Sequence, residues 1–175
     1  NLGLKPQEKI AVFAQNCLQY LYTDMGAYGV RAVTIPFYAT SSEQQIQFVV
    51  NDAQVRFIFV GEQEQYDKAH RVLNLCSSLE RIVVFYRIVR ISSHDPNTLY
   101  FDDFLKLGEN LPRQSEVEKL WSEAKEDDLC NILYTSGTTG DSKGVMITYS
   151  QYHAALVSNA MCVPVNDSDR VISFL

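Results

Sequence analysis

The chain has 175 residues, of which 21 are acidic and 15 are Lys or Arg, so its formal charge is −6. This length is enough for one domain with a buried core and too short for two large domains. The acidic balance excludes nucleic acid as an expected partner, because nucleic-acid binders need a basic face to replace counterions. The sequence contains no apolar run near the roughly 20 residues that a membrane helix requires.

The two ends of the sequence suggest a longer protein. The chain begins at Asn1 without a Met, a basic segment or an apolar segment, so no signal peptide is recognised. It ends on the apolar run 171–175, which is typical of a buried strand rather than of a frayed terminus. We therefore expect the chain to be one part of a larger polypeptide.

The candidate metal-ligating residues are scattered. The cysteines are Cys17, Cys76, Cys130 and Cys162, and the histidines are His70, His94 and His153. No pair has the spacing of a zinc site, so we expect no metal site and interpret the cysteines as free thiols. Free thiols indicate a reducing compartment, and the predicted location is the cytoplasm.

Strand-like and helix-like segments alternate along the chain. Strands are predicted at 10–14, 30–37, 56–60, 81–91 (one strand or two), 130–134 and 145–148. Helices are predicted at 16–28, 43–51, 66–79, 101–108 and 151–161, and the polar, acidic stretch 112–128 is interpreted as a solvated helix. This alternation predicts an α/β fold of three layers, in which helices flank a mostly parallel sheet.

Two predicted helices have informative side-chain patterns. Ser42 is a plausible N-cap for the second helix, whose inward face would carry Ile46, Val49 and Val50. In the first helix the apolar residues are spaced as on one helical face, namely Leu18, Leu21, Tyr22 and Met25. Its tyrosines (Tyr20, Tyr22 and Tyr28) are expected to pack into the core, while a peripheral membrane or subunit contact stays open as the alternative.

The segment 135–144 carries the chemistry. It follows the predicted strand 130–134 directly and reads Thr-Ser-Gly-Thr-Thr-Gly-Asp-Ser-Lys-Gly. Its glycines, Gly137, Gly140 and Gly144, let the backbone approach a ligand closely, and consecutive N–H groups in such a loop can form an anion-binding nest. Hydroxyl donors come from Thr135, Ser136, Thr138 and Thr139, and the only cation is Lys143. Many donors, little bulk and one cation favour a polyphosphate ligand.

Other interpretations of this segment are weaker. It is not a Walker A loop, since Lys143 is followed by Gly144 and a β-rich run instead of a helix. It is not Gly-x-Gly-x-x-Gly, which excludes the dinucleotide fingerprint. A plain Gly/Ser/Thr-rich turn is disfavoured, because eight such fixed positions would coincide by chance on the order of once in 10^10 windows at average composition.

Three stretches resemble a known family. Residues 134–140 and 143–145 resemble the AMP-binding signature of the adenylate-forming enzymes, which include acyl- and aryl-CoA synthetases, peptide-synthetase adenylation domains and luciferases. The stretch 29–42, followed by Asn-Asp-Ala at 51–53, is similar to long-chain fatty-acyl-CoA synthetases. The stretch 8–12 resembles the opening strand of the family. The resemblance implies that residues 1–175 form a C-terminally truncated part of the N-terminal AMP-binding domain.

The resemblance also implies a function. The full enzyme would activate a fatty acid with Mg²⁺ and ATP to an acyl-adenylate, which coenzyme A then converts to a thioester. The residues implied to hold the ATP phosphates are Thr135, Ser136, Gly137, Thr138, Thr139, Gly140, Lys143 and Gly144. Lys143 would offset developing negative charge. No catalytic residue and no metal ligand is implied within this segment, so we expect the isolated piece to be inactive.

Some features leave alternatives open. The family usually has Pro before the loop lysine, whereas this chain has Ser142, and Asp141 adds a carboxylate near the proposed phosphates. Losing the fixed φ of proline predicts a more mobile loop. Three alternatives remain. They are an aryl-CoA ligase, another adenylation domain, and a non-catalytic α/β module whose loop is only a turn or binds a partner's phosphate.

Overall fold

The computed structural model describes residues 2–93, 95–109, 111, 113–135 and 142–170. The strands are β1 (Lys9–Phe13), β2 (Val33–Phe37), β3 (Val55–Val60), β4 (Arg81–Val84), β5 (Thr98–Tyr100), β6 (Leu129–Thr135) and β7 (Lys143–Thr148). The helices are α1 (Leu18–Gly29), α2 (Glu43–Ala53), α3 (Gln63–Leu73), α4 (Phe101–Lys106), α5 (Gln114–Ser122) and α6 (Tyr149–Cys162).

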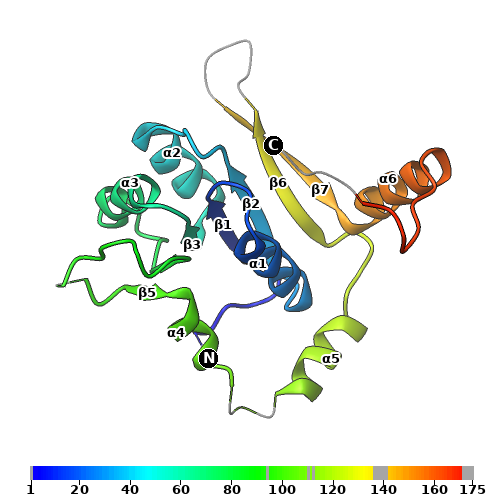
Figure 1. The fold of residues 1–175 in the computed structure, drawn as a ribbon, viewed down its shortest axis with the longest axis horizontal. Coiled ribbons are helices and arrows are strands. Elements are labelled where there is room, and N and C mark those ends of the chain that lie inside the picture. Colours follow the sequence, from blue (N-terminus) through cyan, green and yellow to red (C-terminus); the bar gives the residue numbers. More distant parts are fainter. Residues whose placement is uncertain (1, 94, 110, 112, 136–141, 171–175) are drawn as a thin grey trace.

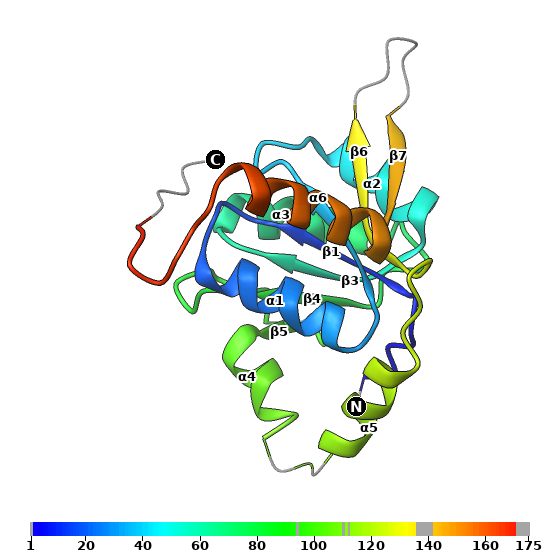
Figure 2. The same ribbon diagram turned by 90° about the vertical axis from the view of Figure 1, so that its right-hand side faces the viewer.

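The strands of the described ranges form one seven-stranded sheet in the order β5-β4-β3-β1-β2-β6-β7 (Figure 1). Neighbouring strands are parallel throughout, except that β7 is antiparallel to β6. Helices α2 and α3 cover one face of the sheet, and α1 lies on the other face together with α6 (Figure 2). The predicted three-layer α/β fold with a mostly parallel sheet is confirmed.

Side chains of the central strand β1 divide between two cores. Successive strand residues point to opposite faces of a sheet, so Ala11 and Phe13 join the core under α2 and α3. Ile10 and Val12 join a second core, which includes Ala27 of α1 and several aromatic rings of β3 and α4. Both faces of the sheet are therefore buried, as a parallel sheet requires.

The predicted start of α2 is confirmed in detail. The backbone N–H of Gln45 donates to the Ser42 hydroxyl over 3.3 Å, and the Ser42 N–H donates to the Gln45 side chain over 2.8 Å. This reciprocal pair is a capping box, which satisfies two amides at the helix start. The predicted inward residues Ile46, Val49 and Val50 are all buried.

Helix α1 forms where predicted but is turned differently. The apolar residues Leu18, Leu21, Tyr22 and Met25 are all exposed, and the buried residues are Thr23 and Ala27. The side chains that α1 buries are therefore small ones. The prediction that the tyrosines of this helix pack into the core is therefore wrong for Tyr22. Tyr20 is partly buried and packs against the second core.

The segment after β4 differs from the prediction of a strand over 81–91. The strand ends at Val84, and the Val89 N–H then donates to the Tyr86 carbonyl over 3.1 Å, which makes a turn. The short strand β5 was not predicted, because three residues carry too little pattern. Helix α3 ends at Leu73, earlier than predicted, although Cys76 is buried as expected.

Helix α5 and the cysteines are as the sequence predicts. The acidic stretch contains α5, which has no buried residue and is thus the solvated helix that was predicted. All four cysteines are free thiols, with Cys76 and Cys130 buried. The strand predicted over 171–175 lies outside the described residues. Among the helices within the described ranges, none combines the length and apolar content needed to cross a bilayer.

Candidate phosphate-binding site

The candidate site is built at the tip of the hairpin formed by β6 and β7, where β6 ends and β7 begins. The two strands pair antiparallel, with Tyr134 opposite Gly144 and Thr135 opposite Lys143. In Figure 1 this hairpin projects beyond the carboxyl edge of the parallel sheet. Two sets of contacts, one at each end of β6, hold the hairpin on the rest of the domain.

The first set fixes the start of β6. The Gln7 side chain pairs with the backbone of Leu129 twice, because its amide donates to the carbonyl over 3.2 Å and its oxygen accepts from the N–H over 2.9 Å. Just before the strand, Nη2 of Arg31 lies 2.7 Å from Oδ2 of Asp128. Burial by itself raises the pKa of the Asp128 carboxyl. The Lys125 backbone N–H and the Arg31 guanidinium together lower it by more, so the pKa lies below its usual value.

The second set fixes the end of β6. The Tyr134 hydroxyl donates to Oδ2 of Asp52 over 2.5 Å, and the Tyr134 ring lies edge-on to the Phe48 ring at 6.5 Å. Asp52 and Phe48 both belong to α2. Burial, followed by the neighbouring Asp52 carboxylate, raises the pKa of Tyr134, so the phenol stays protonated and remains a donor.

Gly144 is required by packing as well as by its place in the motif. A Cβ at this position would lie 2.9 Å from the Ile132 side chain and 3.1 Å from the Tyr134 ring. The ring of Tyr134 therefore covers the bare backbone of the opposite strand, an arrangement that often rescues a glycine at a sheet edge. Only glycine lets β7 approach β6 this closely.

Thr135 and Lys143 are the described residues at the tip of the hairpin. Both residues are exposed and lie directly opposite each other in the hairpin register. Because paired residues on antiparallel strands project to the same face, a hydroxyl donor and an ammonium group are placed side by side at the hairpin tip. Ser142 immediately precedes β7.

Five of the predicted phosphate-binding residues lie outside the described residues, namely Ser136, Gly137, Thr138, Thr139 and Gly140, and so does Asp141. The structure thus brings together Thr135, Lys143 and Gly144 of the predicted set. A helix does not follow the lysine, because Lys143 opens β7, which agrees with the exclusion of a Walker A loop.

Sequence reasoning missed the side chains that support this hairpin. Asp52 and Tyr134 were noted only as parts of two separate motifs, and Phe48 was not noted at all. No local pattern links the two residues, because 82 positions separate them. Only the fold shows that the two residues pair.

A polar network lies beside the hairpin, between β2, β6 and α1. The Tyr28 hydroxyl donates to Oδ1 of Asn131 over 3.1 Å, and the Asn131 amide donates to the Thr34 hydroxyl over 2.5 Å. Thr34 also lies near Asp24 and lowers the pKa of its carboxyl group. Burial raises the pKa of Asp24 to about 6, and the bond from Thr34 only partly offsets this effect.

Metal ligands are not evident at this site. Within the described ranges, no three His, Cys, Asp or Glu side chains gather closely enough to hold a metal ion. The magnesium that the family resemblance implies stays a prediction for the full-length protein.

Comparisons with known proteins agree with this architecture. Residues 1–175 match the protein family described as AMP-binding enzyme. The chain is 31% identical over 156 residues to fatty acyl-CoA synthetase A of Dictyostelium discoideum, covering 85% of this chain and 22% of that protein. It is 27% identical over 148 residues to a long-chain-fatty-acid–CoA ligase of Xenopus laevis, covering 85% of this chain and 20% of the relative.

Solved structures share the fold. An anthranilate CoA ligase in complex with anthranoyl-AMP superposes with a TM-score of 0.75 at 20% identity, covering 91% of this chain and 28% of that one. A putative long-chain-fatty-acid CoA ligase from Rhodopseudomonas palustris gives 0.74 at 17% identity, covering 96% and 38%. The chain thus spans about a fifth of the length of the first curated relatives it matches. Since the family match extends over its whole length, the chain belongs to the AMP-binding enzyme family.

Proposed function

We propose that the chain is the N-terminal part of the AMP-binding domain of a long-chain fatty acid–CoA ligase. The full protein would use ATP to convert a fatty acid to an acyl-adenylate and then form a thioester with coenzyme A. The small-molecule partners are therefore fatty acid, ATP and coenzyme A. The curated relatives described as fatty acyl-CoA synthetases support this substrate class. A cytoplasmic location with peripheral membrane contact stays a prediction.

The observation that carries the proposal is the placement of Thr135 opposite Lys143 at the hairpin tip. The hydroxyl of Thr135 can donate to a phosphate oxygen, and the Lys143 ammonium can lie against the charge that grows on the departing pyrophosphate. The backbone that carries both residues is held before the substrate binds, because β6 is anchored at both ends and β7 is paired to it. Preorganised charges of this kind lower an activation barrier without acid–base chemistry.

The site needs no protein nucleophile. The substrate carboxylate attacks the nucleotide, so the residues of this chain bind, orient and neutralise. The isolated chain supplies the phosphate-binding hairpin and only a fifth of the relatives' length, so we propose that it is inactive alone. Acyl-CoA formation by the isolated chain would contradict this.

The test is a lysine substitution in the full-length protein. Lys143→Ala should slow fatty-acid-dependent ATP–pyrophosphate exchange at least about tenfold, the scale of losing one preorganised charge. The matched control is Lys119→Ala, which removes the same charge from α5, where Lys119 makes only an exposed pair with Glu123 at 3.7 Å. Equal exchange rates in both variants would refute the phosphate role and favour the non-catalytic module.

The choice of acid tests the substrate class. Exchange stimulated by palmitate and not by benzoate supports the long-chain ligase. The reverse preference would replace it by the aryl-CoA ligase, while Lys143 would keep its role in either case.

A further inference from the structure

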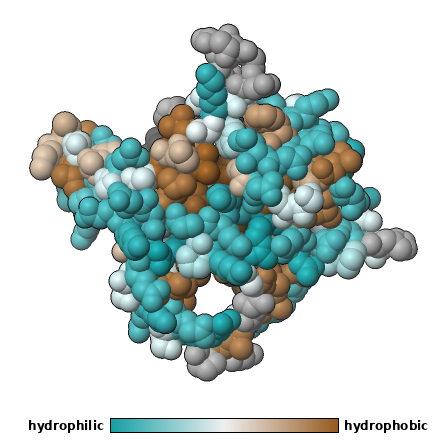
Figure 3. All heavy atoms as spheres, turned by 180° about the vertical axis from the view of Figure 1, so that it is seen from behind, coloured by the Kyte–Doolittle hydropathy of each residue, from teal (hydrophilic) through white to brown (hydrophobic). Residues whose placement is uncertain are grey.

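The hairpin of β6 and β7 leaves the body of the domain halfway along β6. Residues 130–132 are buried, whereas Leu133 and Thr135 are exposed. The pairing of β6 with β2 falls at Asn131, which lies opposite Thr34. In the space-filling view from behind, the end of the hairpin rises at the top of the molecule (Figure 3). The residues of the proposed phosphate site therefore lie beyond the part of β6 that pairs with β2.

Beyond that point, Tyr134 connects the hairpin to α2. Its hydroxyl donates to Oδ2 of Asp52 over 2.5 Å, and its ring stands edge-on to the Phe48 ring with 6.5 Å between the centroids. Phe48 and Asp52 are four residues apart on α2, so their side chains are neighbours on one face of the helix. The Tyr134 ring also lies beside Gly144, where a Cβ would come within 3.1 Å of it. One side chain of β6 thus contacts both α2 and β7.

Helix α2 is itself held in place. Ile46 and Val50 on its inner face are fully buried. Its first turn is closed by the capping box at Ser42, and the ammonium group of Lys68 on α3 donates to the neighbouring Ser41 carbonyl over 3.0 Å. A side chain that bonds to a fixed helix is restricted in turn, so α2 can define the orientation of the hairpin.

The contact with α2 lies on the face of the hairpin that the phosphate site does not use. Successive residues of a strand point to opposite faces, so the side chains of Tyr134 and Thr135 project to opposite sides of β6. Thr135 shares its face with Lys143, which lies opposite it in the register. Tyr134 shares the other face with Gly144. The negative charge of Asp52 is therefore kept on the side away from the Lys143 ammonium group.

We propose that Tyr134 and Asp52 are positioning residues, which fix the orientation in which the hairpin presents its phosphate-binding residues to ATP. This inference rests on the proposed function, because it concerns the same site. The two residues act through the backbone, since Tyr134 adjoins Thr135 in β6 and contacts the neighbour of Lys143 in β7. Without their bond the hairpin samples more orientations, so the ammonium group is aligned with the departing pyrophosphate for a smaller fraction of the time.

The test measures fatty-acid-dependent ATP–pyrophosphate exchange in the full-length protein. Tyr134→Phe keeps the ring beside Phe48 and Gly144 and removes only the hydroxyl. We expect exchange to slow about fivefold, which corresponds to about 1 kcal/mol. Asp52→Ala removes the acceptor of the same bond and should slow exchange by a similar factor.

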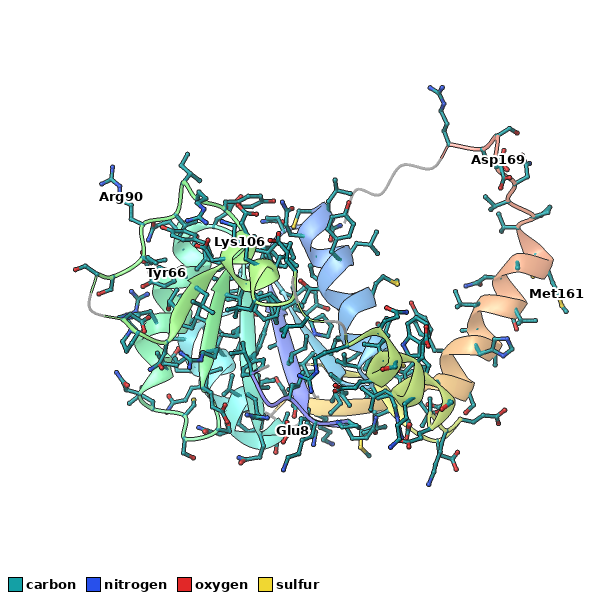
Figure 4. The ribbon with its side chains drawn as sticks, turned by 90° about the horizontal axis from the view of Figure 1, so that it is seen from below. Glu8, Tyr66, Arg90, Lys106, Met161 and Asp169 are labelled. Atoms are coloured by element: carbon teal, nitrogen blue, oxygen red, sulfur yellow. The ribbon has the colours of Figure 1, made fainter. Side chains whose placement is uncertain are left out.

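Tyr100→Phe is the matched control. The Tyr100 hydroxyl donates to the Val89 carbonyl over 2.8 Å, and Tyr100 ends β5, at the opposite edge of the sheet from β7. Figure 4 shows Lys106 of α4, the helix after β5, on the other side of the molecule from Met161 of α6, the helix after β7 (Figure 4). This variant removes a bond of the same kind and should leave exchange unchanged. A loss equal to that of Tyr134→Phe would overturn the proposal, because exchange would then report only stability.

A double variant separates positioning from stability. If Tyr134 acts through Lys143, Tyr134→Phe should slow exchange less than about twofold in the Lys143→Ala background. An equal loss in both backgrounds would overturn the proposal, since a merely structural effect does not depend on Lys143.

The two proposals can fail separately. Slow exchange in Lys143→Ala together with normal exchange in Tyr134→Phe would leave the proposed function in place and remove the positioning role. Unchanged exchange in Lys143→Ala would refute the phosphate role of the hairpin, and the positioning role would fall with it.

Discussion

The Tyr134 hydroxyl and the Asp52 carboxylate meet at 2.5 Å, although 82 positions separate them in the chain. This contact ties the end of β6 to α2 and thereby sets where the β6–β7 hairpin, the proposed phosphate site, leaves the sheet. Tyr134→Phe keeps the ring against Phe48 and deletes only the hydrogen bond. We expect a loss of about 1 kcal/mol in the free energy of unfolding, the usual net value of one such bond.

A double-mutant cycle measures this bond. Urea unfolding of Tyr134→Phe, Asp52→Asn and the double variant gives the coupling between the two residues. Additive effects would show that the hydroxyl and the carboxylate do not interact in solution.

Gly144 and Gly26 provide a matched pair of substitutions. Gly144→Ala forces a methyl group to within 2.9 Å of Ile132, so we expect a destabilisation of about 1–3 kcal/mol from overpacking. Gly26→Ala meets open space within α1 and should be neutral or stabilise by up to about 1 kcal/mol, because Ala favours a helix. Denaturant unfolding checks both, and equal effects would contradict the packing role of Gly144.

Asp24 predicts a pH-dependent stability. Its pKa is raised from 3.8 in the unfolded chain to about 6 in the folded chain, because it is buried. The folded state therefore holds the proton more tightly, and stability falls as pH rises from about 4 through 6. Asp24→Asn removes this charge and should stabilise the chain at pH 7 by about 1–2 kcal/mol after allowance for solvent.

The pH comparison isolates the effect of Asp24. The advantage of Asp24→Asn over the wild type should shrink when unfolding is measured at pH 5, where part of Asp24 is protonated. An advantage that stays constant from pH 7 to pH 5 would show that burial does not perturb this carboxyl.

The Arg31–Asp128 pair should matter far more than an exposed pair. Both side chains are nearly buried, with 11% and 12% exposed. Arg31→Ala leaves the Asp128 carboxylate without its partner, so we expect a loss of about 3 kcal/mol. The control, Arg71→Ala, breaks an exposed pair with Glu43 at the same 2.7 Å and should cost less than about 1 kcal/mol. Chemical denaturation that finds equal losses would contradict this ranking.

The sequence by itself determined the order and type of most elements, the capping of α2 at Ser42 and the position of the Thr135–Gly144 motif. These features depend on neighbours within a few residues, because hydrophobic periodicity, caps and glycine-rich turns are local. The buried face of α2 was predictable for the same reason, since Ile46, Val49 and Val50 repeat with the helical period.

Only the tertiary structure decided which face of α1 is buried, because the helical spacing of its larger apolar residues does not mark the face that carries Thr23 and Ala27. It also decided the pairing of Tyr134 with Asp52 and the packing reason for Gly144. Each of these depends on segments that are distant in the chain and adjacent in space. Such contacts leave no periodic trace in a single sequence, so the fold had to bring them together before they could be recognised.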